Sequence, residues 1–172
     1  MQRARATSRG RVEALRSQGN TEVVREALQQ YAERGVFQGF SIRRGRHGLD
    51  EYRFTWLTRE PTIVRFDPGT DTLTFSDLLP GAGSESAVVQ DVEALVTSRS
   101  ARTLPAHRRI DRRRAAVRCE QRRRRLSVVV EIKGRHAAYG VQRGVNLVHE
   151  IFVLLQASHP EYLWDVFGLP VE

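Results

Sequence analysis

The spacing of apolar and polar residues changes once along this chain, from a helical period to a strand period. Residues 11–18 have helical spacing, and Gly19 followed by Asn20-Thr21-Glu22 has the form of a helix stop and a new cap. A second helix then extends to about Arg34, where Gly35 ends it. We therefore expect two short helices before the first strand.

From Val36 onward apolar and polar residues alternate, and turns rich in Gly, Pro and Asp separate the alternating runs. Alternation puts Tyr52 and Phe54 on one face of a sheet and Arg53 on the other. We expect the apolar face to be covered and the polar face, with Arg53, Arg65, Thr55, Thr72 and Thr74, to be simply solvated. The predicted strands of this four-stranded antiparallel meander are Val36–Arg43, Glu51–Leu57, Thr62–Phe66 and Thr72–Phe75.

Helical spacing returns later and predicts the layer that covers the sheet. One helix is predicted from a Ser84 cap to about Arg99, followed by a polar loop over Ser100–Asp111. A final long helix is predicted over Ala137–Ala157, where Gly140 and Gly144 favour close packing on the sheet. The aromatic tail after Pro160 could close its own core or a dimer interface.

Residues 112–132 allow two interpretations. Leu126–Ile132 has the residue types of a strand, whereas Arg112–Arg125 contains good helix formers and has no Gly, Pro or Asn to turn a hairpin. We favour a hairpin of Arg114–Glu120 with Arg125–Ile132 over a basic helix that leads into a single strand. Four adjacent guanidinium groups cannot all be buried without partners, so Arg122–Arg125 should lie at an end or tip.

These elements predict an α+β fold: an antiparallel meander sheet of about four to six strands, with helices packed on one face in two layers. The length of 172 residues favours a single domain over residues 20–172, preceded by a basic segment over residues 1–19 that contains a short helix. Cys119 is the lone cysteine, and no run of about 18 apolar residues occurs. We expect a soluble, cytoplasmic protein with no membrane association.

Charge is strongly segregated along the chain. Fourteen of the 28 basic residues lie in Arg99–Arg135 with only three acids, which gives this window a net charge of 14 − 3 = +11, whereas the whole chain carries +8. Only one of the basic residues, Lys133, is a lysine, so a general preference for arginine explains the residue type but not its concentration. If the window forms one positive patch, it should attract polyanions.

Closely spaced guanidinium groups bind phosphate oxygens through paired hydrogen bonds. A solvated charged edge is the alternative explanation for such a cluster. The candidate nucleic-acid-binding residues are Arg108, Arg109, Arg112, Arg113, Arg114, Arg122, Arg123, Arg124 and Arg125.

Other chemistry has little support in the residue pattern. Gly81-Ala82-Gly83-Ser84 lacks the Gly-Lys-Ser/Thr ending of a phosphate loop, and His149-Glu150 has Val153 where a zinc protease needs a second histidine. Cys119 has the setting of a structural thiol. The carboxylate pairs Asp50-Glu51 and Asp67 with Asp71 look like turn residues that flank strands. We therefore expect no enzymatic activity, no metal and no cofactor.

The predicted order over roughly residues 20–158, helix, antiparallel strands, helix, hairpin, helix, resembles that of specialised-secretion chaperones and similar small dimeric folds. The likeness covers element order alone and carries no motif or functional residue. It implies a protein-binding adaptor or a secretion-chaperone-like dimer, and the positive charge of this chain would suit an acidic partner. Our first hypothesis remains a non-enzymatic module that holds nucleic acid or another polyanion by its backbone, with weak sequence dependence.

Overall fold

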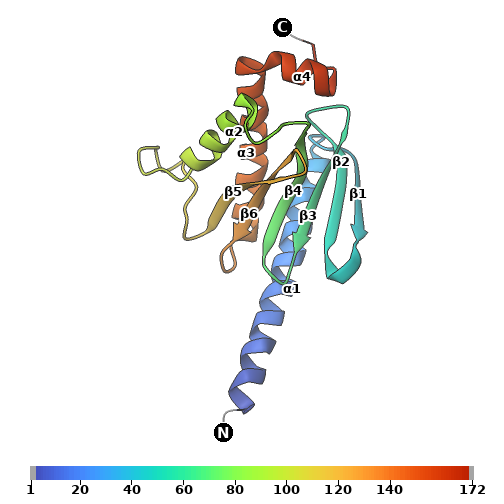
Figure 1. Ribbon diagram of the computed structural model, residues 1–172. Coiled ribbons are helices and arrows are strands. Elements are labelled where there is room, and N and C mark those ends of the chain that lie inside the picture. Colours follow the sequence, from blue (N-terminus) through green and yellow to red (C-terminus); the bar gives the residue numbers. More distant parts are fainter. Residues whose placement is uncertain (1–2, 171–172) are drawn as a thin grey trace.

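The computed structural model describes the backbone of residues 3–170 and the side chains of residues 10–12 and 19–170. The fold is α+β, as predicted: a six-stranded antiparallel sheet carries the helices on one face. Figure 1 shows the long helices running behind the sheet. The elements are α1 (Arg3–Glu33), β1 (Gln38–Arg44), η1 (Arg46–Gly48), β2 (Asp50–Thr55), β3 (Pro61–Asp67), β4 (Thr72–Pro80), α2 (Ala87–Ser98), β5 (Ala115–Arg122), β6 (Arg125–Ile132), α3 (Ala137–Ser158) and α4 (Pro160–Phe167).

The N-terminal region corrects the prediction of two helices, because α1 runs without interruption through Gly19. Glycine in a helix interior costs about 1 kcal/mol relative to alanine but does not have to end the helix. Asn20 does not cap a new helix. Its side-chain amide, on a residue only 4% exposed, donates to Asp71 Oδ1 and to the Gly134 carbonyl, both at 3.0 Å. Apart from Arg11, the basic side chains of the predicted N-terminal segment lie outside the described residues.

A second buried polar contact holds α1 against β2. Arg25 donates to the Asp50 carboxylate at 2.9 Å, and the Tyr52 hydroxyl donates to the same oxygen at 3.4 Å. Burial, followed by the charge of Asp50, raises the pKa of the Tyr52 phenol, so this hydroxyl stays protonated. The part of α1 that precedes Asn20 extends beyond the end of the sheet (Figure 1).

The strand order is β1-β2-β3-β4-β6-β5, so the β5–β6 hairpin adds to the predicted four-stranded meander. The fourth strand is longer than predicted. It continues to Pro80 because a bulge at Asp77, where φ is +50°, shifts the register between Phe75 and Leu79 without ending the strand. The Asp77 backbone N–H donates to Ser127 Oγ at 2.9 Å across this irregularity.

The two faces of the sheet differ as the alternation predicted. Tyr52, Phe54, Val64 and Phe66 are buried beneath the helices. The opposite face carries polar side chains, which are exposed at Arg53 and Arg65 and half-buried at Thr55, Thr72 and Thr74.

The helical layer follows the prediction with shifted boundaries. The cap of α2 is Ser86 rather than Ser84, and its hydroxyl accepts the Val89 N–H at 3.3 Å. A Cβ on Gly140 would lie 2.7 Å from Ile132 Cγ1, and one on Gly144 would lie 2.8 Å from Phe75 Cε2, so α3 sits directly on the sheet.

The aromatic tail forms α4 and packs on its own chain. Leu163 is buried, the Phe167 ring lies 5.9 Å from the Phe152 ring, and the Tyr162 hydroxyl donates to the Pro80 carbonyl at 2.8 Å. Of the two expected roles of this tail, closing its own core is the one visible in the chain. Within residues 3–170 no helix combines the length and apolarity needed to cross a bilayer.

Candidate polyanion interface

The arginine-rich window contains the predicted hairpin and not the alternative basic helix. β5 pairs with β6 from Ala115 opposite Ile132 to Arg122 opposite Arg125. The two turn residues, Arg123 and Arg124, have φ values of +50° and +58°. A turn of this left-handed conformation normally has Asn-Gly at its two central positions. Because arginines occupy both positions here, the residues themselves did not indicate a turn. The four-arginine run therefore lies at a hairpin tip, as predicted.

We call Arg122–Arg125 the tip cluster. Arg125 forms an ion pair with Asp77 at 3.3 Å, and Arg124 donates to the Gly81 carbonyl at 3.2 Å. Arg122 and Arg123 are exposed and form no ion pair with any described residue. The protein's own groups thus already engage half of the tip cluster.

The loop that precedes β5 folds around Asp111 and Tyr139. The Asp111 backbone N–H donates to the Tyr139 hydroxyl at 2.8 Å, and the Asp111 carboxylate accepts the Arg113 N–H at 2.9 Å. The Asp111 carbonyl also accepts the N–H groups of Arg114 and Ala115. These bonds give the predicted polar loop a defined turn that leads into β5.

This loop and the start of α3 enclose a hollow of about 500 Å³, which we call the arginine hollow. Tyr139 and Asp111 contribute to its lining, and Asp111 is the only acidic residue among the described lining residues. The arginines that line it are Arg102, Arg109, Arg112, Arg113, Arg114 and Arg143.

Tyr139 holds two of these arginines in place. The Arg114 guanidinium lies over its ring at 3.8 Å from the centroid, and the Arg143 guanidinium lies at 5.1 Å. Arg143 also donates to the His107 carbonyl at 3.0 Å. Tyr139 is 8% exposed, so it serves as a buried platform for the cations and offers no free face to a ligand.

The hollow carries an excess of positive charge, because its lining has six arginines and one aspartate. Its six arginines form no ion pair with a carboxylate anywhere in the described part of the chain. Neighbouring cations behave differently: Arg99 pairs with Glu150, while Arg118 and Lys133 both pair with Glu131. An anion that enters the hollow would therefore meet guanidinium groups that no described carboxylate neutralises, although Arg143 also donates to the His107 carbonyl.

The predicted site residues separate into two places. Arg109, Arg112, Arg113 and Arg114 line the arginine hollow, whereas Arg108 is exposed beside it and is not among the lining residues. Arg122–Arg125 lie at the other end of β5, about 23 Å away at roughly 3.3 Å per residue. The arginines of the window therefore gather in two clusters at opposite ends of β5.

Arg102 and Arg143 belong to the hollow but were not singled out from the sequence. Arg102 has no arginine or lysine within five residues on its C-terminal side, and Arg143 lies on a helix far along the chain. The spacing of Arg143 four residues after Tyr139 was the one available signal, because residues four apart on a helix are neighbours.

The other candidate groups have structural surroundings. Burial raises the pKa of the Cys119 thiol to about 12, and Glu93 adds to the effect, so the thiol is not a nucleophile at neutral pH. Asp50 is held by Arg25, and Asp67 accepts the Gly69 N–H at 2.8 Å in its turn. No group of three or more His, Cys, Asp or Glu residues is arranged for a metal ion among the described residues. Neither a protein-family model, nor a curated protein, nor a solved structure matches the chain.

Proposed function

We propose that this protein is a non-enzymatic module that binds nucleic acid or another polyanion by its phosphates, with weak dependence on sequence. The observation that carries the proposal is the arginine hollow, in which six arginines face one aspartate and form no ion pairs with described residues. Guanidinium groups bind phosphate through two parallel hydrogen bonds. Two of the six, those of Arg114 and Arg143, lie against the Tyr139 ring.

The shape of the hollow favours phosphate contacts over contacts to bases. Tyr139 is the one aromatic residue among its lining residues, and both ring neighbours are arginines. Base stacking needs an accessible aromatic face, whereas backbone contact needs only cations. If about six arginines contact phosphates, the logarithm of affinity for duplex DNA should fall with the logarithm of salt with a slope near −5.

A matched pair of variants tests this function. Arg102, Arg112 and Arg113 are exposed residues of the hollow, and Arg43, Arg46 and Arg53 are exposed arginines elsewhere. Replacing either trio by glutamine removes the same charge, and neither change should unfold the protein. We expect the first triple variant to lose roughly a hundredfold in affinity for labelled DNA, RNA or polyphosphate at low salt, at about 1 kcal/mol per lost contact.

The control triple variant should lose much less, because it lowers only the net charge. Equal losses in the two triple variants, or no binding by the unsubstituted protein at low salt, would contradict the proposal. Purification without nuclease adds a second readout, the ratio of absorbance at 260 and 280 nm. A clean protein spectrum together with a stoichiometric acidic protein would instead support the adaptor alternative.

A further inference from the structure

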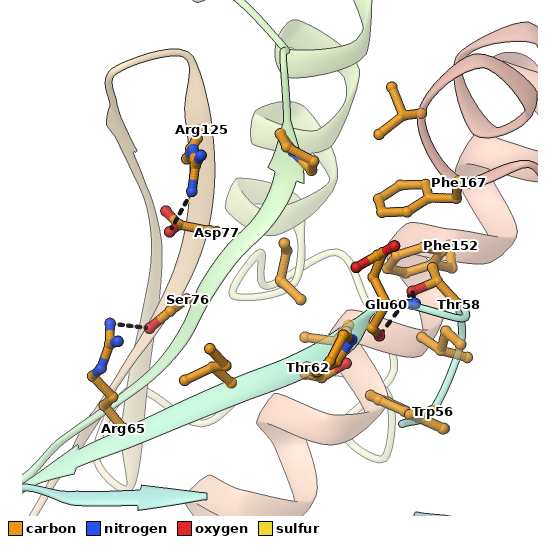
Figure 2. A pocket seen from close by; sticks show the side chains of 17 residues that line it. Trp56, Thr58, Glu60, Thr62, Arg65, Ser76, Asp77, Arg125, Phe152 and Phe167 are labelled. Carbon is orange, nitrogen blue, oxygen red and sulfur yellow. Dashed lines mark hydrogen bonds and ion pairs between the residues drawn. The ribbon is translucent and has the colours of Figure 1, made fainter. Parts of the chain in front are cut away.

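β3 and β4 separate at one end of the sheet and leave an opening to the core. Their pairing begins at Ile63 opposite Ser76 and runs only toward Asp67 opposite Thr72. Beyond Ser76, the bulge at Asp77 turns β4 away, and its last residues pair with β6 alone. Figure 2 shows the two strands diverging on either side of this opening.

The opening leads into a pocket of about 370 Å³ lined by both apolar and polar side chains. This volume lies within the range of about 300–1,000 Å³ that is typical of small-molecule sites. Trp56 lies after β2, Phe152 comes from α3, and Phe167 comes from α4, so three parts of the fold supply aromatic rings to one pocket. None of these rings belongs to the arginine hollow.

The charges at the pocket indicate which ligand it would accept. Arg65 is held by Glu51 at 3.0 Å and by Ser76 at 3.2 Å, and Arg125 is held by Asp77 at 3.3 Å. Both cations of the lining are therefore already engaged. Glu60 is exposed and forms no ion pair with any described residue.

The position of Glu60 directs its charge into the pocket. Thr58 fixes the backbone of Glu60 through two bonds of 3.2 Å, one to its carbonyl and one from its N–H. In Figure 2 the Glu60 carboxylate points toward the rings of Phe152 and Phe167. A cation placed between a carboxylate and aromatic rings is attracted by both, by the negative charge of the carboxylate and by the negative faces of the rings.

We propose that this pocket binds a small amphipathic cation, namely a primary amine with an aromatic or aliphatic body. Its apolar part packs against Phe152 and Phe167, and its ammonium group lies between Glu60 and the ring faces. Anions are disfavoured because Glu60 repels them and because Arg65 and Arg125 already have carboxylate partners. This site is independent of the arginine hollow and of polyanion binding.

Three probes of similar shape test the proposal: benzylammonium, benzyl alcohol and benzoate at constant ionic strength. Trp164 is 55% exposed and does not line the pocket, so Trp164→Phe leaves Trp56 as the only tryptophan and makes its fluorescence a local reporter. We expect benzylammonium to bind about fivefold more tightly than benzyl alcohol, and benzoate to bind most weakly. Calorimetry on the unsubstituted protein gives the same order without relying on Trp164→Phe.

A charge-matched pair of variants completes the test. Glu60→Gln should remove the preference for benzylammonium and keep the binding of benzyl alcohol, whereas Glu26→Gln, at an exposed residue of α1, should change neither. Equal binding of all three probes, tightest binding of benzoate, no response of Trp56, or an unchanged preference in Glu60→Gln would each overturn the proposal. None of these results bears on polyanion binding, because no probe is a polyanion.

Discussion

The two ends of the β5–β6 hairpin carry similar densities of arginine and differ in what surrounds those arginines. At the tip, Arg124 and Arg125 are engaged by Gly81 and Asp77. In the arginine hollow Arg143 donates to the His107 carbonyl, but no described carboxylate pairs with any of the six guanidinium groups. A run of like charges in a sequence therefore does not by itself define a binding site. Which run of arginines remains available to a ligand depends on whether the protein's own carboxylate and carbonyl groups already bind its guanidinium groups.

Rigidity separates the two ends as well. The hollow is anchored on α3 through Arg143 and the buried Tyr139, and α3 itself packs closely on the sheet at Gly144. The tip is a two-residue turn at the end of the sheet. A preorganised set of donors loses less entropy on binding, which favours the hollow as the polyanion site.

The largest expected effect concerns the attachment of α3. Gly144→Ala would place a Cβ 2.8 Å from Phe75 Cε2 and 3.1 Å from Val130 Cγ2, in a core that cannot yield cheaply. We expect a loss of about 1–3 kcal/mol in the free energy of unfolding, measured by urea denaturation. Gly83→Ala, beside the tip, meets only the flexible end of Arg124 at 3.7 Å and should be nearly neutral. Similar losses in both variants would remove this distinction between the two ends.

A smaller effect is expected from the hydroxyl of Tyr139. Tyr139→Phe removes the acceptor of the Asp111 N–H, and Tyr162→Phe removes a donor to Pro80 near the tip. Each change should cost about 1 kcal/mol of stability. Only Tyr139→Phe should also weaken polyanion binding, because it loosens the loop that carries Arg112 and Arg113. Weakened binding in Tyr162→Phe, or unchanged binding in Tyr139→Phe, would show that the loop geometry is not what matters.

The smallest effect concerns the turn itself. Arg123 and Arg124 both adopt left-handed conformations, which cost a residue other than glycine about 1 kcal/mol or more. Replacing the pair by Asn-Gly should therefore raise the melting temperature by about 2–4 °C, measured by circular dichroism. A lower melting temperature would mean that contacts of these arginine side chains, such as the bond from Arg124 to Gly81, outweigh the backbone strain.

Local patterns predicted most of the fold. The alternation around Tyr52 and Phe54 identified the buried face of the sheet, and the helical spacing over Ala137–Ala157 identified α3. The helix end predicted at Gly19 was wrong because a single glycine is tolerated inside a helix. The next residue, Asn20, forms side-chain hydrogen bonds to Asp71 and to the Gly134 carbonyl. These hydrogen bonds join residues that lie far apart in the chain, so no local sequence pattern could predict them.

The candidate site was predictable in part, for the same reason. The run at Arg112–Arg114 is visible in the sequence, but its separation from Arg122–Arg125 depends on the hairpin register. The contribution of Arg143 depends on α3 crossing beside the loop, and the bulge at Asp77 that opens the second pocket has no glycine to mark it. Compensation of charge is likewise a property of tertiary contacts.

The salt dependence of binding tests the central claim most directly, by comparing Arg102, Arg112 and Arg113→Gln with Arg122, Arg123 and Arg124→Gln. If the hollow supplies the phosphate contacts, the slope of log affinity against log salt on duplex DNA should become shallower in the hollow variant by about 2.7, at roughly 0.9 per contact. In the tip variant the slope should change by less than about 1. An equal or larger change in the tip variant would contradict the account.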